Sequence, residues 1–330
     1  MRMHCDIVCE APISAELLYN FHEHLIPTLI QAIAINFKHP KIEGPISHDN
    51  LEGFDGIGTG MSGGVDSLHV TLRHMGQEPY MPKVTHLITV NSGALYAQPI
   101  GGGTVTKTEK QKEAVRTVFG KAREIANELS LPLVEMDSNI YEVCTSLANG
   151  KGLFVQLNTF LSIACVYALQ KLFKTYLFSS SYKYTQFDIK NANLIDSSYY
   201  DLLNLNCFST SDIRFYSEGA PWDRIEKLVS IVDSKVAQRH LHVCLVSGEN
   251  CGQCMKCART MLSLDHLGYL DEFSESFPID KYKKNLHKLL TFITKSKIAG
   301  VGTDISIFEA LAKGKYKKEL AQIMNKLSNV

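Results

Sequence analysis

The chain lacks an excess of charge of either sign, because its 34 lysines and arginines balance its 34 aspartates and glutamates. Without a net charge, no long-range field draws the protein towards nucleic acid or an anionic membrane. The balance therefore argues against a nucleic-acid partner, although a local basic groove is still compatible with it. The first residues, MRMHCDIVCEAP, lack the long apolar stretch of a secretory signal. We expect a cytoplasmic protein.

A disulfide framework is not expected either, because cysteines in a chain without an export signal stay reduced. Of the nine cysteines, five are scattered along the chain: Cys5, Cys9, Cys144, Cys165 and Cys207. Cys144 and Cys165 lie in apolar surroundings, which is typical of buried thiols. The other four lie close together near the C-terminal third.

A long uncharged stretch, GLFVQLNTFLSIACVYALQ, lies between Lys151 and Lys171 and could span a bilayer by length. Polar residues interrupt it, and neither an aromatic belt nor a charge asymmetry flanks it. We therefore expect a buried helix and no membrane association.

Predicted strands and helices alternate through the centre of the chain. Strands are predicted to end at Met61 and to cover 85–91, 132–138, 175–182, 213–219 and 240–246. Helices are predicted over 13–36 (interrupted at Pro27), 66–75, 108–129, 139–148, 153–173, 220–234, 281–296 and 306–328. Residues 92–104 and 183–206 are expected to form loops. The alternation predicts an α/β fold with a doubly wound parallel sheet.

Three segments follow from this organisation. Residues 1–52 are predicted to form an N-terminal helical extension, residues 53–268 the main domain, and residues 269–330 a helical tail. Ligands of such sheets bind at the carboxyl ends of the strands, and the first of these ends is Met61-Ser62.

The stretch GTGMSGGVDS at 58–67 is the most unusual in composition. Gly63 and Gly64 permit close approach of an anion to several backbone N–H groups, and the following helix adds the positive end of its dipole. Asp66 would repel a phosphate unless a bridging Mg²⁺ binds both. The loop is thus suited to a magnesium nucleotide.

Other interpretations of the loop are weaker. A Walker A loop needs a lysine that is absent here. A dinucleotide fingerprint GxGxxG is formally present, but the second strand ends in Asn91 where an acidic residue would bind the ribose. A glycine-rich turn with a capping aspartate is the structural alternative.

Four cysteines, Cys244, Cys251, Cys254 and Cys257, follow a C-x6-C-x2-C-x2-C spacing. This spacing suits tetrahedral coordination of a structural Zn²⁺, with Gly252 providing the tight turn. An iron–sulfur cluster or redox-active thiols remain open. Lys256 and Arg259 are expected to offset part of the thiolate charge.

The hexapeptide SGGVDS, preceded by Gly60-Met61, resembles the phosphate loop of the N-type ATP pyrophosphatases, an adenine nucleotide alpha hydrolase-like group. The resemblance implies that ATP is cleaved between its α and β phosphates and that AMP is transferred to a substrate oxygen. It implies a nucleotide site formed by Gly60, Met61, Ser62, Gly63, Gly64, Val65, Asp66, Ser67, Val90 and Asn91. By the same resemblance, Asp66 binds magnesium, Ser62 holds pyrophosphate, and Lys183 neutralises a phosphate.

Together with the later CGQCMKC, the loop resembles 7-cyano-7-deazaguanine synthase over residues 55–265. The chain departs from that enzyme in the long loop after the second strand, in FDIKNANLIDSSYYDLLN, and in its extra N-terminal and C-terminal parts. Relatives of this kind often form homodimers.

These features predict an ATP-dependent ligase that forms C–N bonds. A carboxylate or amide oxygen of a small-molecule or modified-base substrate would be adenylated and then attacked by ammonia or an amine. The alternatives are 7-cyano-7-deazaguanine synthase itself, a tRNA-thiolation enzyme using cysteines such as Cys144 and Cys165, and a nucleotide-binding regulatory module without turnover. A dehydrogenase is the more distant alternative. Replacing Asp66 by Asn is expected to abolish turnover and to leave the fold intact.

Overall fold

A computed structural model describes residues 5–32, 38–93, 109–147, 154–187, 196–244 and 247–328. Most of the predicted loop at 92–104 and residues 188–195 of the predicted loop at 183–206 lie outside these ranges. The chain divides into two compact units. Unit 1 comprises Met1–Gly60, Glu78–Thr108 and Val134–Glu218, and unit 2 comprises Met61–Gln77, Glu109–Leu133 and Gly219–Val330. The predicted division at 52 and 268 stays a prediction.

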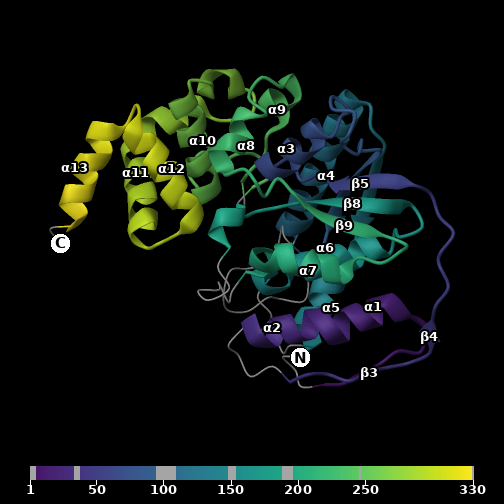
Figure 1. Cartoon of the computed structure of the whole chain (residues 1–330). Coiled ribbons are helices and arrows are strands. Elements are labelled where there is room, and N and C mark those ends of the chain that lie inside the picture. The colour runs from purple at the N-terminus through teal and green to yellow at the C-terminus, as the bar shows by residue number, and fades with distance from the viewer. Residues whose placement is uncertain are drawn as a thin grey trace. The chain divides into compact units, whose positions relative to one another are not determined.

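Unit 1 is built on a five-stranded sheet in the order β7-β6-β5-β8-β9 (Figure 1). The strands are β5 (Gly56–Gly60), β6 (His86–Asn91), β7 (Leu133–Asp137), β8 (Phe173–Ser179) and β9 (Arg214–Glu218). The pairs β5–β6, β5–β8 and β8–β9 are parallel. The predicted α/β fold with a parallel sheet is therefore confirmed.

The core of unit 1 lies between this sheet and helices α6 (Phe154–Tyr167) and α7 (Asp201–Phe208) (Figure 1). Phe173 and Phe215 from the strands pack there with Ile163 of α6 and Leu205 of α7, and each is at most 2% exposed. The period-2 pattern of the strands supplies one side of this core, and the apolar face of each helix supplies the other.

Unit 1 also contains α5 (Ile140–Leu147) and the N-terminal elements. Two short parallel ladders pair β1 (Ile7–Val8) with β3 (Ile42–Glu43) and β2 (Ile13–Ser14) with β4 (Ile46–Ser47). The predicted helix at 13–36 is interrupted before Pro27, because a π-helical turn (Phe21–Leu25) separates α1 (Ala15–Asn20) from α2 (Ile26–Ala32).

Unit 2 is helical in its described residues. It contains α3 (Val65–Arg73), α4 (Glu109–Leu129), α8 (Arg224–Val229), α9 (Lys235–His240) and α10 (Met255–Leu267). The C-terminal helices α11 (Ile279–Ile298), α12 (Gly302–Lys313) and α13 (Lys317–Ser328) lie side by side (Figure 1). The predicted helix at 306–328 is thus two helices, which are separated at Gly314.

The apolar stretch at 153–173 forms α6, which has 14 residues and ends at Tyr167. Among the described residues, none of the helices combines the length and the apolar character that a bilayer crossing requires.

The predicted strand at 240–246 is wrong: α9 ends at His240 and the next described residues, 241–244, form no ladder. Their backbone groups pair differently. The side chain of Asn250 accepts from the Val243 N–H at 2.9 Å and donates to the Leu241 carbonyl at 2.8 Å, and the His242 N–H donates to the Gly63 carbonyl. The Asn250 side chain thus pairs with backbone groups that a neighbouring strand would have bonded in the predicted sheet.

We expect Asn250→Ala to lower the free energy of unfolding by about 3 kcal/mol or more, because it leaves buried backbone groups unpaired. Asn250 is 6% exposed and also donates to the Ser276 carbonyl at 2.8 Å. Urea unfolding provides the measurement. The control is Asn285→Ala, which removes one exposed hydrogen bond. Equal stability of the two variants would contradict this role of Asn250.

Candidate functional site

The loop at the start of unit 2 turns sharply between Met61 and α3. Gly63 has φ +72°, in the left-handed region that favours glycine, and its carbonyl is held by the His242 N–H at 2.8 Å. Ser62 and Ser67 face each other with their Oγ atoms 3.2 Å apart, and the Gly64 N–H donates to Ser62 Oγ at 3.3 Å. The predicted loop residues in this unit therefore form one tight turn.

The N-terminus of α3 is open to an anion. Gly64 is its N-cap and offers no side-chain acceptor to the first helical N–H groups. These groups have no partner within a helix and carry the positive end of its dipole. Met61 and Val65 are 1% and 0% exposed, so their burial holds the turn and its backbone N–H groups in place.

Asp66, in the first turn of α3, is paired with two cations of α8. Arg224 Nη1 lies 2.7 Å from one carboxylate oxygen and Lys227 Nζ lies 3.0 Å from the other. The Lys227 side chain is 3% exposed, and that of Asp66 is 28% exposed. The helix α8 starts at Arg224 because Asp223 and Glu226 form a capping box.

Burial by itself would raise the pKa of Asp66, but Arg224 and Lys227 outweigh it and hold this pKa well below its usual range. Lys256 at the start of α10 adds to the same effect. Desolvation and the positive charges of Arg224 and Arg259 lower the pKa of Lys256 itself. One carboxylate therefore stands among a surplus of positive charge, beside the open end of a helix.

Arg224 and Lys227 were not among the predicted site residues. They lie 158 and 161 residues beyond Asp66, in a helix that was predicted without any role. A second set of contacts fixes the same two helices: His69 Nδ1 lies 2.6 Å from Ser230 Oγ, and the Arg73 guanidinium lies 4.1 Å from the Trp222 ring. The spacing of 66, 69 and 73 on one face of α3 was the available signal.

Val90 and Asn91, predicted at the adenine, end strand β6 in unit 1. Asn91 is 1% exposed and donates its amide to Asp137 Oδ1 at 2.6 Å. Its Oδ1 is a buried acceptor that has no hydrogen-bond partner in the described part of the chain. Such an atom fits an exocyclic amine, as an adenine provides.

Gly60 and Lys183 also belong to unit 1. Gly60 ends β5, where an added Cβ would lie 3.1 Å from the Tyr176 hydroxyl. Lys183 is half-buried after β8, and its backbone N–H donates to Gln186 Oε1 at 2.8 Å. Its predicted contact with a phosphate stays a prediction.

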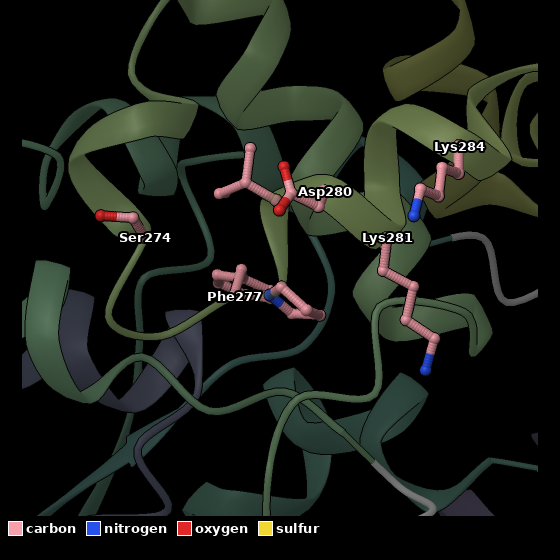
Figure 2. A pocket seen from close by; sticks show the side chains of 7 residues that line it. Ser274, Phe277, Asp280, Lys281 and Lys284 are labelled. Carbon is pink, nitrogen blue, oxygen red and sulfur yellow. The ribbon is translucent and has the colours of Figure 1, made fainter.

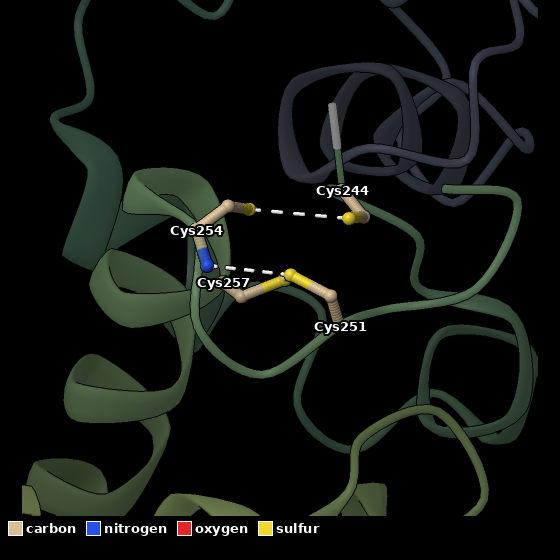
Figure 3. Close-up of side chains that lie close together, drawn as sticks. All are labelled: Cys244, Cys251, Cys254 and Cys257. Atoms are coloured by element: carbon tan, nitrogen blue, oxygen red, sulfur yellow. Dashed lines mark hydrogen bonds between the residues drawn. The ribbon is translucent and has the colours of Figure 1, made fainter. Parts of the chain in front are cut away.

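The four clustered cysteines meet in unit 2 (Figure 3). All four Sγ atoms lie within 4.8 Å of one another, with Cys251–Cys257 at 4.0 Å and Cys244–Cys254 at 3.9 Å. The Cys254 N–H points at Cys251 Sγ at 3.3 Å. Gly252, with φ +70°, makes the turn, as predicted, and an added Cβ would lie 2.8 Å from Pro278.

These thiols fit a bound metal ion. A tetrahedron with metal–sulfur bonds of about 2.3 Å has sulfur–sulfur edges of about 3.8 Å, close to the two shortest distances here. The neighbouring Cys254 thiol and burial raise the pKa of Cys257, and burial raises that of Cys251. A coordinated cation removes this penalty because it binds the thiolates directly.

Arg259 does not compensate the thiolate charge as expected. Its guanidinium forms two hydrogen bonds with Asp304 of α12, which is fully buried. The reason is this ion pair, in which the buried Asp304 carboxylate already neutralises the charge of Arg259. Arg259 instead ties α10 to the C-terminal helices.

A pocket of unit 2 lies elsewhere, at the N-terminus of α11 (Figure 2). It measures about 510 Å³ and is lined by Ser274, Phe277, Pro278, Ile279, Asp280, Lys281 and Lys284. None of the predicted site residues lines this pocket, so we do not assign the candidate site to it.

No protein-family profile matches the chain, and no curated protein sequence matches it. Among solved structures, the U34-tRNA thiolase NcsA from Methanococcus maripaludis, determined with its [4Fe-4S] cluster, is similar over 88% of this chain and 78% of its own. The sequence identity is 12% and the TM-score is 0.37. These values do not assign the chain to a family.

We expect Asp66→Asn to lower the free energy of unfolding by about 2–3 kcal/mol, because it leaves the buried Lys227 without its carboxylate. The partial exposure of Asp66 keeps the loss below that of a fully buried pair. The measurement is urea unfolding, with Asp271→Asn as the control, since Asp271 and its partner Lys283 are largely exposed.

The stability difference between wild type and Asp66→Asn should depend on pH in one direction. Because the pKa of Asp66 is lowered in the folded state, the ion pairs stabilise the protein fully above the unfolded value of about 3.9. We expect the difference to be constant above about pH 5 and to shrink as the pH falls below about 4. A difference that grows on acidification would contradict the pairing.

Proposed function

We propose that the loop Met61–Ser67 binds the outer phosphates of ATP and that the chain transfers AMP to an acceptor oxygen with release of pyrophosphate. The observation that carries this proposal is the charge arrangement at Asp66. Among the described residues, Arg224 and Lys227 contact the Asp66 carboxylate at the N-terminus of α3, and the positive charge of Lys256 also helps to lower the pKa of Asp66. A polyanion with an associated cation complements this arrangement.

In this proposal, the loop amides, Ser62 and Ser67 hold the pyrophosphate oxygens. Arg224 and Lys227 stabilise the negative charge that develops on the leaving pyrophosphate. A magnesium ion bound with the phosphates would supply further charge neutralisation. Asp66 would hold it only after releasing Arg224 or Lys227, which contact its two oxygens in this structure. Asn91 and Lys183 belong to unit 1, and their predicted contacts with the adenine and a phosphate stay predictions.

The reaction consists of two displacements. An acceptor oxygen attacks the α-phosphorus as the bond to the β-phosphate oxygen breaks. Ammonia or an amine then attacks the activated carbon, AMP leaves with the acceptor oxygen, and the nitrogen releases a proton to solvent. Because both steps depend on position and charge, few acid–base groups are needed. The sequence resemblance to 7-cyano-7-deazaguanine synthase supports a C–N bond as the product.

Thiolation receives less support from the described residues. A reactive thiol needs a lowered pKa. Burial instead raises the pKa of Cys144 and of Cys165.

We also propose that Cys244, Cys251, Cys254 and Cys257 bind one Zn²⁺. A cubane iron–sulfur cluster places its four ligands at separate iron atoms and requires a wider spacing than the one found. Zinc held by four thiolates has no open coordination position, so its role is structural. It fixes the start of α10 and thereby Lys256.

The activity is tested with ATP labelled at the α-phosphate, together with candidate carboxylic acids, including 7-carboxy-7-deazaguanine, and ammonia or primary amines. We expect labelled AMP and pyrophosphate. Lys227→Met should lower the rate at least about 100-fold, because it removes a positive charge that stabilises the leaving pyrophosphate. The matched control is Lys121→Met, which breaks the ion pair with Glu249. ADP and phosphate as products, or equal rates in the two variants, would refute the mechanism.

The metal is tested by elemental analysis of the purified chain. We expect one zinc per chain in the wild type and in the control Cys207→Ser. Cys207 is buried and does not belong to the group of four cysteines. Cys257→Ser should lose the metal and unfold at lower urea concentration, since metal binding contributes to folding. Iron with acid-labile sulfide would instead identify a cluster.

A further inference from the structure

A buried polar cluster lies in unit 1, where the short helix Ser197–Tyr200 leads into α7. The side chains of Asp201 and Asn204 are buried, at 2% and 0% exposure. The Thr159 hydroxyl donates to Asp201 Oδ1 at 2.7 Å, and the Thr159 N–H donates to Ser197 Oγ at 3.1 Å. These bonds hold one side of the Asp201 carboxyl group in place.

The other side of the cluster is unsatisfied. Among the described residues, Asp201 Oδ2, both amide atoms of Asn204 and the Tyr200 hydroxyl are buried and have no hydrogen-bond partner. Asp201 and Asn204 are three residues apart and share one face of α7, and Tyr200 is the N-cap of this helix. Native proteins satisfy nearly all their buried polar atoms, so several unpaired ones on one face indicate a missing ligand.

The protonation state of Asp201 defines the chemistry of that ligand. Burial raises the pKa of Asp201 well above its usual value, and the nearby Asp196 adds to this, while the Thr159 hydrogen bond opposes it. The neutral carboxyl group offers one O–H donor and one carbonyl acceptor, and the Asn204 carboxamide offers an N–H donor and an acceptor. Both groups complement a C=O next to an N–H.

Aromatic rings adjoin the cluster. Tyr199 lies edge-on to Tyr182 at 5.4 Å and to Tyr200 at 5.3 Å between ring centroids, and Phe187 lies 5.5 Å from Tyr199. Tyr182 is fixed by its hydroxyl, which donates to Asp196 Oδ2 at 2.8 Å. Ordered aromatic side chains beside hydrogen-bonding groups favour planar ligands.

We propose that Asp201, Asn204 and Tyr200 form a binding site for a neutral, planar heterocycle with a cis-amide (lactam) edge. The site's existence is independent of the nucleotide loop. Its use for the acceptor substrate rests on the proposed function, which leaves the acceptor open.

The test is a ligand-observed NMR titration of the full chain with four fragments. Hypoxanthine and uracil carry a cis-amide edge, whereas purine and pyrimidine have the same rings without it. We expect the two lactams to bind at least about tenfold more tightly than the parent rings, as the pairing of buried polar groups requires. Equal binding of the parent rings, or no binding of the lactams, would overturn the proposal.

Variants assign the binding to the cluster. Asn204→Leu and Asp201→Leu should weaken lactam binding at least about tenfold, while Asp201→Asn should stay within about threefold because a carboxamide keeps the donor and the acceptor. If Asp201→Asn loses as much as Asp201→Leu, the group acts as a carboxylate and the ligand is a cation, which overturns the proposal.

Stability provides a second readout that separates a ligand site from a structural hydrogen-bond network. Without ligand, Asn204→Leu should raise the urea midpoint, because apolar atoms replace unpaired polar ones of similar shape. Asn250→Leu is the matched control and should lower it, because the Asn250 amide is fully hydrogen-bonded. A loss of stability in Asn204→Leu equal to that of the control would show that Asn204 is satisfied internally, by protein or water.

The two proposals fail separately. Lys227→Met should lose nucleotide binding and keep hypoxanthine binding, while Asn204→Leu should do the reverse. Lactam binding without ATP cleavage would remove only the proposed function, and ATP cleavage without lactam binding would remove only the site at Asp201.

Discussion

The pairing of Asp66 with Arg224 and Lys227 determines what unit 2 can bind. A single carboxylate cannot neutralise the cations around it, and the open end of α3 adds more positive potential at the same place. The surplus is stable without a ligand because each of the two α8 cations contacts a different oxygen of Asp66. The proposed binding of a phosphate chain rests on this arrangement, since an anion there would complete the charge balance.

The cysteine cluster and Asn250 stabilise the support of this site. The segment from His242 to Cys257 contacts the loop through the bond from the His242 N–H to the Gly63 carbonyl. Within this segment, the Asn250 side chain binds the backbone of Val243 and Leu241, and the four thiols bring Cys244 and Cys251 against the start of α10. A metal ion there would act at a distance, by holding the backbone that positions Gly63 and Lys256.

In unit 1, by contrast, buried polar groups lower stability because they have no partner among the described residues. Asp201 and Asn204 keep buried polar atoms unpaired, although apolar residues of similar size would pack more favourably. Functional sites commonly carry such a cost, because the atoms that a ligand needs must stay available to it. The unpaired acceptor of Asn91 at the end of β6 follows the same logic.

The sequence by itself determined the α/β alternation, the position of the glycine loop and the set of four cysteines, because each depends on residues that are close in the chain. Periodicity also located β6, α4 and β7 within one residue at each end. Only the tertiary structure revealed Arg224 and Lys227 beside Asp66, the replacement of a strand by Asn250, and the helix α7 with its unpaired Asp201 and Asn204. These features depend on which distant groups satisfy a charge or a hydrogen bond. Local pattern carries no information on that choice, since it is made when the chain folds and water is excluded.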